Sequence, residues 1–190
     1  MKRDRLRFLL LTIGATIGLI AAFMQTIEKL VLLENKDAVL PCRLNDIFNC
    51  STVLSASQSS LFGFPNSLIC IMIFTLLLTI GIVGMTKSRM TRKLLLGVQA
   101  LAFFMLVFAL WFLFTSTYVI GAICIFCLVC LSGLLLINAT LWRLNFSSDQ
   151  MGNKFSRFLQ AIREKNFDIL LWLGLAVLVA AAIIQRFYTQ

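Results

Sequence analysis

The sequence predicts an all-α integral membrane protein with five transmembrane helices, and three observations lead to this prediction. Of the 190 residues, 60% are hydrophobic and 13% are charged, whereas a soluble globular domain is nearer half apolar and a quarter charged. The apolar residues form runs long enough to cross a bilayer as helices. The basic residues lie in short blocks between these runs, so the net charge of +9 indicates orientation in a membrane rather than binding to nucleic acid.

The first apolar run covers about residues 8–33 and follows a basic N-terminus. We interpret it as an uncleaved first transmembrane helix. A cleaved signal peptide is the alternative, but the run is long for one and no clean small-residue cleavage site follows it. On either interpretation the polar segment 34–66, which contains Cys42, Cys50 and a serine-rich stretch, lies on the far side of the membrane. We expect it to form an outward-facing cysteine loop.

A second helix is expected at about residues 67–85, because Pro65 is a residue that favours a helix start. The loop that follows carries four basic residues and no acid. From there the chain is almost unbroken apolar sequence over 94–137, which is too long for one span. The polar residues 115–118 and Gly121 predict a tight turn within it, which divides it into helices at about 94–114 and 120–142.

The segment 143–167 is polar and basic, and we expect it to be a cytoplasmic linker. Apolar residues recur in it at helical spacing, which predicts an amphipathic helix on a membrane surface; a plain solvated linker is the alternative. These apolar residues are Met151, Phe155, Phe158, Leu159 and Ile162. A fifth helix is expected at about 169–187. The predicted organisation is a four-helix catalytic core at 1–142, the linker at 143–167, and the fifth helix with the C-terminus at 168–190.

The distribution of basic residues predicts the orientation of the chain. Thirteen of the 17 lysines and arginines lie in the N-terminus, in the 86–93 loop and in the segment 143–168. Five helices with a cytoplasmic N-terminus place all three of these segments inside the cell. Cys42, Cys50 and the start of the fourth helix then share the outer, oxidising face, where disulfides persist. We expect a bacterial inner membrane, although an endoplasmic reticulum or a thylakoid satisfies the same rule.

The residue inventory restricts the chemistry to cysteine. Histidine is absent from the chain, which excludes histidine-ligated haem or zinc and histidine acid–base catalysis. Cys124 and Cys127 form a Cys-x-x-Cys motif at the expected start of the fourth helix. Unpaired N–H groups and the dipole at a helix N-terminus favour the thiolate, the form that attacks disulfides. Together with Cys42 and Cys50, this motif suits a thiol–disulfide relay.

Each cysteine also has a plainer interpretation. Cys42 and Cys50 suit an inert structural disulfide as well as a redox pair. Four thiolates can bind zinc, but the spacing between Cys42 and Cys50 is wider than in usual metal knuckles, and we predict no metal. Cys70 and Cys130 lie inside predicted helices, and we expect them to act as small buried apolar residues.

Several of these residues resemble one known family. They are the loop cysteines Cys42 and Cys50, the segment from Phe62 to Leu68 (Phe-Gly-Phe-Pro-Asn-Ser-Leu), and Cys124-Ile-Phe-Cys127. In this order they resemble the vitamin K epoxide reductase family, in its bacterial branch, over about residues 8–142. The resemblance implies a four-helix bundle around a quinone, with one extra helix. It also implies roles for the cysteines: Cys50 exchanges with Cys124, and its loop partner Cys42 is exposed to the thiol substrate. The resemblance further implies that Cys127 faces the quinone and that Asn66 donates a hydrogen bond to a quinone carbonyl.

The chain departs from the family pattern at a few positions. Many relatives have a serine six residues after the second loop cysteine, where this chain has Ala56 between Ser55 and Ser57; we take these two serines as candidate quinone contacts. Leu131 stands where some relatives have tyrosine, and Cys70 where a glycine is common. Many bacterial relatives also carry a fused thioredoxin-like domain. This chain is expected to lack it and to use a separate thioredoxin-like (DsbA-like) protein.

The predicted function is therefore a membrane thiol:quinone oxidoreductase that sustains disulfide-bond formation. Electrons are expected to pass from the thioredoxin-like partner through Cys42/Cys50 and Cys124/Cys127 to ubiquinone or menaquinone, with no metal and no haem. Three alternatives remain from the sequence. They are reduction of vitamin K epoxide or a quinone as the end function, an unrelated four-helix disulfide oxidase with the same task, and a non-catalytic membrane scaffold held by disulfides.

Overall fold

The computed structural model describes residues 2–35, 38, 40–86, 90–145 and 167–188. Within these ranges the chain is helical, and its pairing of extended backbone is limited to two isolated bridges. The elements in chain order are α1 (Lys2–Glu34), α2 (Cys50–Ser55), η1 (Ser57–Ser60), α3 (Asn66–Met85), α4 (Arg92–Thr115), η2 (Ser116–Ile120), α5 (Ile125–Asn145) and α7 (Phe167–Tyr188). The amphipathic helix expected around 151–162 lies outside the described residues.

Five helices are long and apolar enough to cross a membrane: α1, α3, α4 continued by η2, α5 and α7. Their spans range from 18 to 31 residues, which matches the ~20 residues that a bilayer core requires. A helix suits these apolar segments because it satisfies every backbone N–H and C=O within itself, where lipid offers no partners. The prediction of an all-α integral membrane protein with five spanning helices is confirmed.

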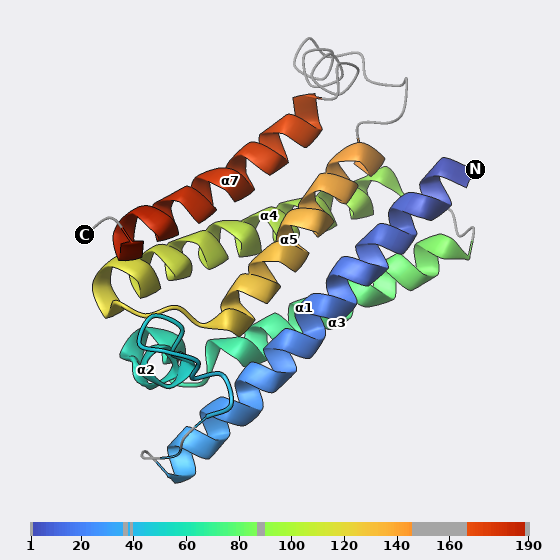
Figure 1. Ribbon diagram of the computed structural model, residues 1–190. Coiled ribbons are helices and arrows are strands. Elements are labelled where there is room, and N and C mark those ends of the chain that lie inside the picture. The colour runs from blue at the N-terminus through green and yellow to red at the C-terminus, as the bar shows by residue number, and fades with distance from the viewer. Residues whose placement is uncertain (1, 36–37, 39, 87–89, 146–166, 189–190) are drawn as a thin grey trace.

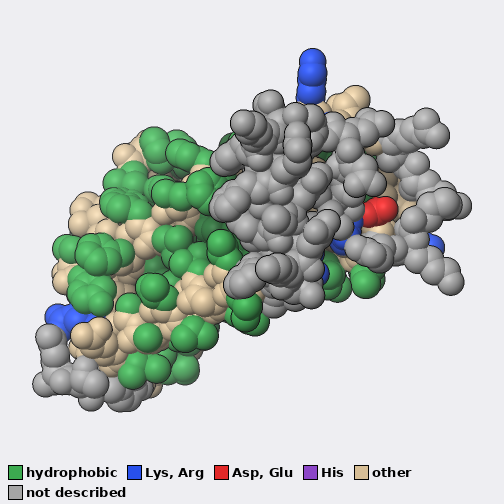
Figure 2. Space-filling model, turned by 90° about the horizontal axis from the view of Figure 1, so that it is seen from above, with side chains coloured by type: hydrophobic (Ala, Val, Ile, Leu, Met, Phe, Trp, Pro, Cys, Tyr) green, Lys and Arg blue, Asp and Glu red, His purple; other side chains and the backbone are tan. Residues whose placement is uncertain are grey.

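Four of the helices form a bundle and the fifth lies against its side (Figure 1). Helix α1 packs against α3 and α5, and α4 packs against α5. Helix α7 touches the bundle through α5 and η2, and no residue of its spanning segment is buried. In the view of Figure 2, apolar side chains are spread over much of the coloured surface, as expected of a face that meets lipid.

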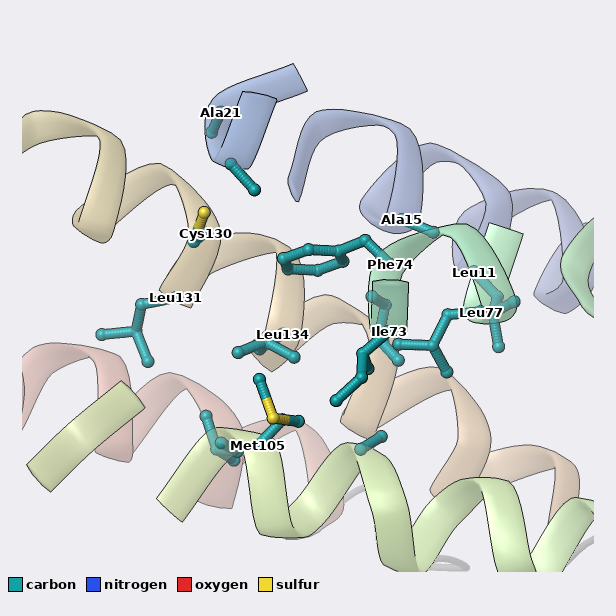
Figure 3. Packing of buried hydrophobic residues seen from close by; sticks show 14 of the residues in the cluster. Leu11, Ala15, Ala21, Ile73, Phe74, Leu77, Met105, Cys130, Leu131 and Leu134 are labelled. Atoms are coloured by element: carbon teal, nitrogen blue, oxygen red, sulfur yellow. The ribbon is translucent and has the colours of Figure 1, made fainter. Parts of the chain in front are cut away.

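The bundle core is made of apolar side chains from all four helices. Figure 3 shows Ala15 of α1, Phe74 of α3, Met105 of α4 and Leu134 of α5 converging on one another. The backbones of α1 and α5 approach closely at Gly14 and Gly133, where a Cβ on Gly133 would lie 2.8 Å from the Gly14 carbonyl oxygen. Small residues at helix crossings permit this approach in membrane bundles.

The turn between the third and fourth spanning helices comes later than the sequence predicts. The helix continues through η2 to Ile120 instead of ending near residue 114. It ends because Gly121 adopts a left-handed conformation (φ 78°) and its N–H, like that of Ala122, donates to the Ser116 carbonyl. The fourth helix therefore begins at Ile125 rather than about 120, and Cys124 lies just before it.

Candidate redox site

The cysteine loop is fastened to the turn that precedes α5. The Ile123 N–H donates to the Ile47 carbonyl at 2.8 Å, and the Asn49 N–H donates to the Ile123 carbonyl at 3.1 Å. Cys50 and Cys124 are the residues that directly follow these two bonded backbones. Both belong to one buried cluster, the cap core, made of Leu32, Leu40, Cys42, Cys50, Val53, Leu54, Phe112, Ala122 and Cys124. The structure thus brings the two loop cysteines and the first helical cysteine together.

Cys42 and Cys50 form a disulfide with their Cα atoms 5.8 Å apart. Cys50 is the first residue of the short helix α2, which Asn49 caps by accepting a hydrogen bond from the Thr52 N–H. The resemblance implied that Cys42 is exposed, but its side chain is only 7% exposed and that of Cys50 is fully buried. The reason is that both residues pack inside the cap core, where Cys42 is the less buried of the two.

A carboxyl group from α1 lies against this disulfide. The Glu28 Oε2 atom is 2.7 Å from Cys42 Sγ, and the Glu28 side chain is 5% exposed. Ligand atoms of Glu28, Cys42 and Cys50 all lie within 4.8 Å of one another, which is close enough for a metal site. The thiolate is the form of cysteine that binds metals, and the disulfide contains none. In the disulfide state, this group of three residues therefore consists of a cystine with a carboxyl group beside it.

Cys124 and Cys127 are free thiols at the start of α5. The Cys127 thiol donates to Cys124 and lowers the pKa of Cys124, and the backbone N–H groups of Cys127 and Phe126 lower it further. The backbone contribution is the effect expected at a helix N-terminus, where the first N–H groups have no partner within the helix. Of the two thiols, Cys124 is the one stabilised as a thiolate.

Cys127 faces a cavity of about 50 Å³. The cavity lies between the helices α1, α3, α4 and α5 and the segment 40–65, which contains α2 and η1 and which we call the cap. The side-chain amide of Gln25 donates to Cys127 Sγ at 3.5 Å. The remaining wall is mostly apolar and aromatic, with the polar residues Ser59, Asn66 and Ser67. The complete lining is Gln25, Ser59, Asn66, Ser67, Cys70, Met105, Phe108, Ala109, Phe112, Cys127, Cys130 and Leu134.

The chemistry of this lining fits a quinone head group, which needs apolar contacts for its ring and a few donors for its two oxygens. The cavity volume of about 50 Å³ is smaller than the ~300–1,000 Å³ of typical ligand pockets. Binding of a quinone head group in this cavity would therefore require wall side chains to move. Met105 and Phe108 are the wall residues best suited to this, since methionine is flexible and Phe108 is only partly buried.

The predicted quinone contacts differ in where the structure places them. Asn66 lines the cavity, but its amide also ties down the cap: it donates to the Gln58 carbonyl at 2.7 Å and accepts from the Leu61 N–H at 3.1 Å. An asparagine amide has two N–H groups, so one remains for a ligand. Ser55 and Ser57 are exposed and are absent from the lining, whereas Ser59, which the sequence did not single out, is buried there.

Three functional residues missed at the sequence level lie together on α1. Gln25, Glu28 and Lys29 share one helix face, because residues three and four apart are neighbours. Lys29 Nζ donates to the Leu54 carbonyl and, at 2.9 Å, to Ser59 Oγ, which holds the cap onto α1. The available signal was the polar group itself, since ionisable residues inside a spanning helix are rare and usually functional.

Cys70 and Cys130 also line the cavity, so three free thiols surround it together with Cys127. Cys130 is buried, and its Sγ lies 3.6 Å from the Gly18 carbonyl oxygen. Cys70 is half-buried. Neither touches the cap core, and we retain the expectation that they serve as small wall residues.

The chain matches a known protein family. The model described as the vitamin K epoxide reductase family matches residues 9–142, which include all six cysteines and the four-helix bundle apart from the first turns of α1 and the last residues of α5. Searches of the curated proteins and of the solved structures find no match.

Proposed function

The chain belongs to the vitamin K epoxide reductase family of membrane oxidoreductases, and from this premise we propose that it oxidises a separate thioredoxin-like (DsbA-like) protein and reduces a membrane quinone. Family membership supports thiol and quinone chemistry in general. The observation that carries the finer proposal is the backbone pairing of the loop with Ile123, because it places Cys50 beside Cys124. Two redox pairs in contact form a route for electrons.

The route begins at the loop pair. A partner thiolate attacks Cys42 Sγ, the Cys42–Cys50 bond breaks, and a second partner thiol resolves the mixed disulfide. The partner is oxidised to its disulfide, and the loop gains two electrons, so that Cys42 and Cys50 are both reduced. Cys42 is the entry point because it is the less buried of the two sulfurs.

The next step moves the electrons to the helical pair. The Cys50 thiolate attacks Cys124 of an oxidised Cys124–Cys127 pair, and Cys127 leaves as a thiolate. Cys42 then attacks Cys50 Sγ, which restores the loop disulfide and releases the Cys124 thiolate. The lowered pKa of Cys124 favours this last step, because a thiol of lower pKa leaves faster. The structure, with an oxidised loop and free Cys124 and Cys127, corresponds to the state that follows.

The cavity is where we propose that ubiquinone or menaquinone binds. When bound, a quinone supplies an acceptor for two electrons and two protons. Cys127 lies in the cavity wall and is the residue that we propose to deliver the electrons. Gln25 orients the Cys127 sulfur through its 3.5 Å contact. Asn66 has one amide hydrogen left to offer a quinone oxygen, whose negative charge grows on reduction.

We further propose a bacterial inner membrane, with both cysteine pairs on the outer face. Both pairs lie at the end of the bundle where α1 ends and α5 begins. Arg7, Arg92 and Arg143 lie at the opposite end, where α1 and α4 begin and α5 ends (Figure 1). This arrangement agrees with the positive-inside rule.

The test is a reconstituted reaction. Purified protein is mixed with a reduced thioredoxin-like protein and a soluble quinone, and quinone absorbance is followed. The proposal predicts quinone reduction that disappears in the Cys127→Ala variant while the fold, judged by circular dichroism, is unchanged. Absence of reduction with any quinone by folded wild-type protein would instead favour a scaffold held by disulfides.

A further inference from the structure

The buried carboxyl of Glu28 is in hydrogen-bond contact with Cys42. Its Oε2 atom is 2.7 Å from Cys42 Sγ, and the Cys42 backbone N–H also donates to the carboxyl. Glu28 lies near the end of a spanning helix, at the level where the cap covers the bundle. A charged carboxylate is costly in such a place unless it is paired.

Lys29, the adjacent cation, does not pair with Glu28. Its ammonium group is directed to the Leu54 carbonyl and Ser59 Oγ instead. The titratable groups that face Glu28 among the described residues are the cysteines Cys42, Cys50 and Cys124. The nearby basic residue Arg43 is exposed. Among the described residues, the side chains with which Glu28 can exchange a proton are therefore these cysteines.

The proton on this contact depends on the redox state of the loop. In the disulfide, Cys42 Sγ has no hydrogen, so a hydrogen bond between the two atoms exists only when the Glu28 carboxyl is protonated and donates to sulfur. In the reduced loop, the Cys42 thiol has a hydrogen and can donate to a Glu28 carboxylate. A single proton therefore forms the hydrogen bond in both redox states, bound to Glu28 in the oxidised loop and to Cys42 in the reduced loop.

We propose that Glu28 is a catalytic acid and base that gives a proton to Cys42 when the loop disulfide is reduced and takes it back when the disulfide re-forms. This inference rests on the proposed function, in which Cys42 is the entry point for electrons. In the forward step, two partner thiols become a disulfide; their two electrons pass to the two loop cysteines and their two protons pass to solvent. Cys42 leaves as a thiolate, receives the Glu28 proton and becomes a thiol; Cys50 remains a thiolate.

The return step uses the same proton in the opposite direction. After Cys50 has formed its bond with Cys124, the Glu28 carboxylate removes the Cys42 proton. The resulting Cys42 thiolate attacks Cys50 Sγ, the Cys42–Cys50 bond forms, the Cys50–Cys124 bond breaks, and Cys124 leaves as a thiolate. Two electrons have then moved from the loop pair to the helical pair, and Glu28 is again protonated.

A single-turnover experiment tests the forward step without any quinone. In a Cys124→Ala, Cys127→Ala background, the loop disulfide is reduced by dithiothreitol across a range of pH, and thiols are counted by mass spectrometry after alkylation. Glu28→Gln is expected to slow the step in which Cys42 leaves the mixed disulfide by about 100-fold near neutral pH, the lower range for loss of a general acid, so that the adduct between Cys42 and dithiothreitol accumulates. Because no quinone is involved, this result stands even if the proposed electron acceptor is wrong.

The pH profile separates catalysis from a structural role. With Glu28, the rate rises as dithiothreitol ionises and then falls as the carboxyl loses its proton; with Glu28→Gln only the rise remains. Glu28→Asp retains an acid and is expected to recover the fall. Glu34→Gln makes the same substitution at an exposed position of the same helix and is expected to match the parent. A Glu28→Gln rate within twofold of the parent, with the same profile, would overturn the proposal.

An infrared measurement on the wild-type chain covers the case in which Glu28→Gln does not fold. The redox-difference spectrum should contain a carbonyl band of a protonated carboxyl that is present with the loop oxidised and lost with the loop reduced. Glu34→Gln should leave this band in place, and Glu28→Asp should shift it. A spectrum without any such band would show that no carboxyl changes its protonation with the loop, and the proposal would fail.

Discussion

The two cysteine pairs share one end of the bundle, but α1 surrounds them with different groups. The loop pair is a disulfide, packed in the cap core, with the carboxyl of Glu28 against Cys42. The helical pair is reduced, at the start of α5, with the amide of Gln25 against Cys127. An acid suits the pair that must gain and lose protons as it meets a partner, whereas a neutral amide suits a pair beside an apolar cavity. One helix turn of α1 thus places a different polar group against each pair, and the proposed function gives the two pairs different tasks.

The largest expected effect separates the tasks of the two pairs by changing the reductant. With a thioredoxin-like protein as reductant, Cys50→Ala and Cys127→Ala should each lower quinone reduction by about 1,000-fold or more, since both remove a sulfur that forms a bond during transfer. With a small membrane-permeant dithiol, which can reach the helical pair directly, Cys50→Ala should recover activity and Cys127→Ala should not. Quinone absorbance reports both cases. Equal inactivity of the two variants with the small dithiol would mean that the pairs do not have separate tasks.

A second difference concerns stability, because only the loop pair is a covalent link. Its sequence separation of 8 closes a short loop, and a disulfide of that size contributes about 2.5 kcal/mol by restricting the unfolded chain. The double variant Cys42→Ala, Cys50→Ala should therefore unfold at a lower temperature in detergent than the double variant Cys124→Ala, Cys127→Ala. Calorimetry of both variants makes the comparison. A larger loss in the helical variant would contradict the assignment of the resting disulfide to the loop.

The third prediction concerns the ionisation of Cys124. Because the Cys127 thiol is the main cause that lowers the pKa of Cys124, Cys127→Ala should raise that pKa. A higher pKa reduces the thiolate fraction at any pH below it, so alkylation of Cys124 by iodoacetamide should slow near neutral pH and recover as the pH rises. Peptide mapping across a pH series measures this. A pH profile unchanged by Cys127→Ala would show that the helix N-terminus alone sets the ionisation.

The smallest expected effect comes from Gln25, whose contact with Cys127 is a single hydrogen bond to sulfur at 3.5 Å. Gln25→Leu should slow quinone reduction by about tenfold, the upper range for loss of one ordinary hydrogen bond, and should leave reduction of the loop disulfide unchanged. Stopped-flow measurements of the two half-reactions distinguish them. Slowing of both half-reactions to the same extent would indicate that Gln25 supports the fold rather than the helical pair.

The fold was predictable because lipid restricts it. Runs of apolar sequence, interrupted by basic or polar segments, were enough to identify five spanning helices. The end of the third spanning helix, α4 continued by η2, was harder to predict. The Ser116 carbonyl accepts from two N–H groups beyond the turn, and this extends the helix past the polar residues that suggested a break. Local sequence indicated a turn, but the backbone bonds that position it lie outside any local pattern.

The candidate site was predictable only where its residues are neighbours in the sequence and form a local motif. Cys124 and Cys127 are a local motif, whereas Gln25 and Cys127 are 102 positions apart, and no periodicity links them. The serines show the same limit. The stretch around Ala56 contains several serines, and the tight turn of η1 decides that Ser59 points inward while Ser55 and Ser57 are exposed. Without the tertiary arrangement, these residues are equivalent candidates.

The central claim is that electrons pass directly from Cys50 to Cys124, and disulfide mapping of a trapped intermediate tests it. In the Cys42→Ala variant, the sulfur that would release Cys124 from Cys50 is missing, so the mixed disulfide should persist. Non-reducing digestion followed by mass spectrometry is predicted to find the peptide containing Cys50 joined to the peptide containing Cys124, with Cys127 free. A Cys124–Cys127 disulfide with Cys50 unpaired, or a bond from Cys50 to Cys127 instead, would contradict the claim.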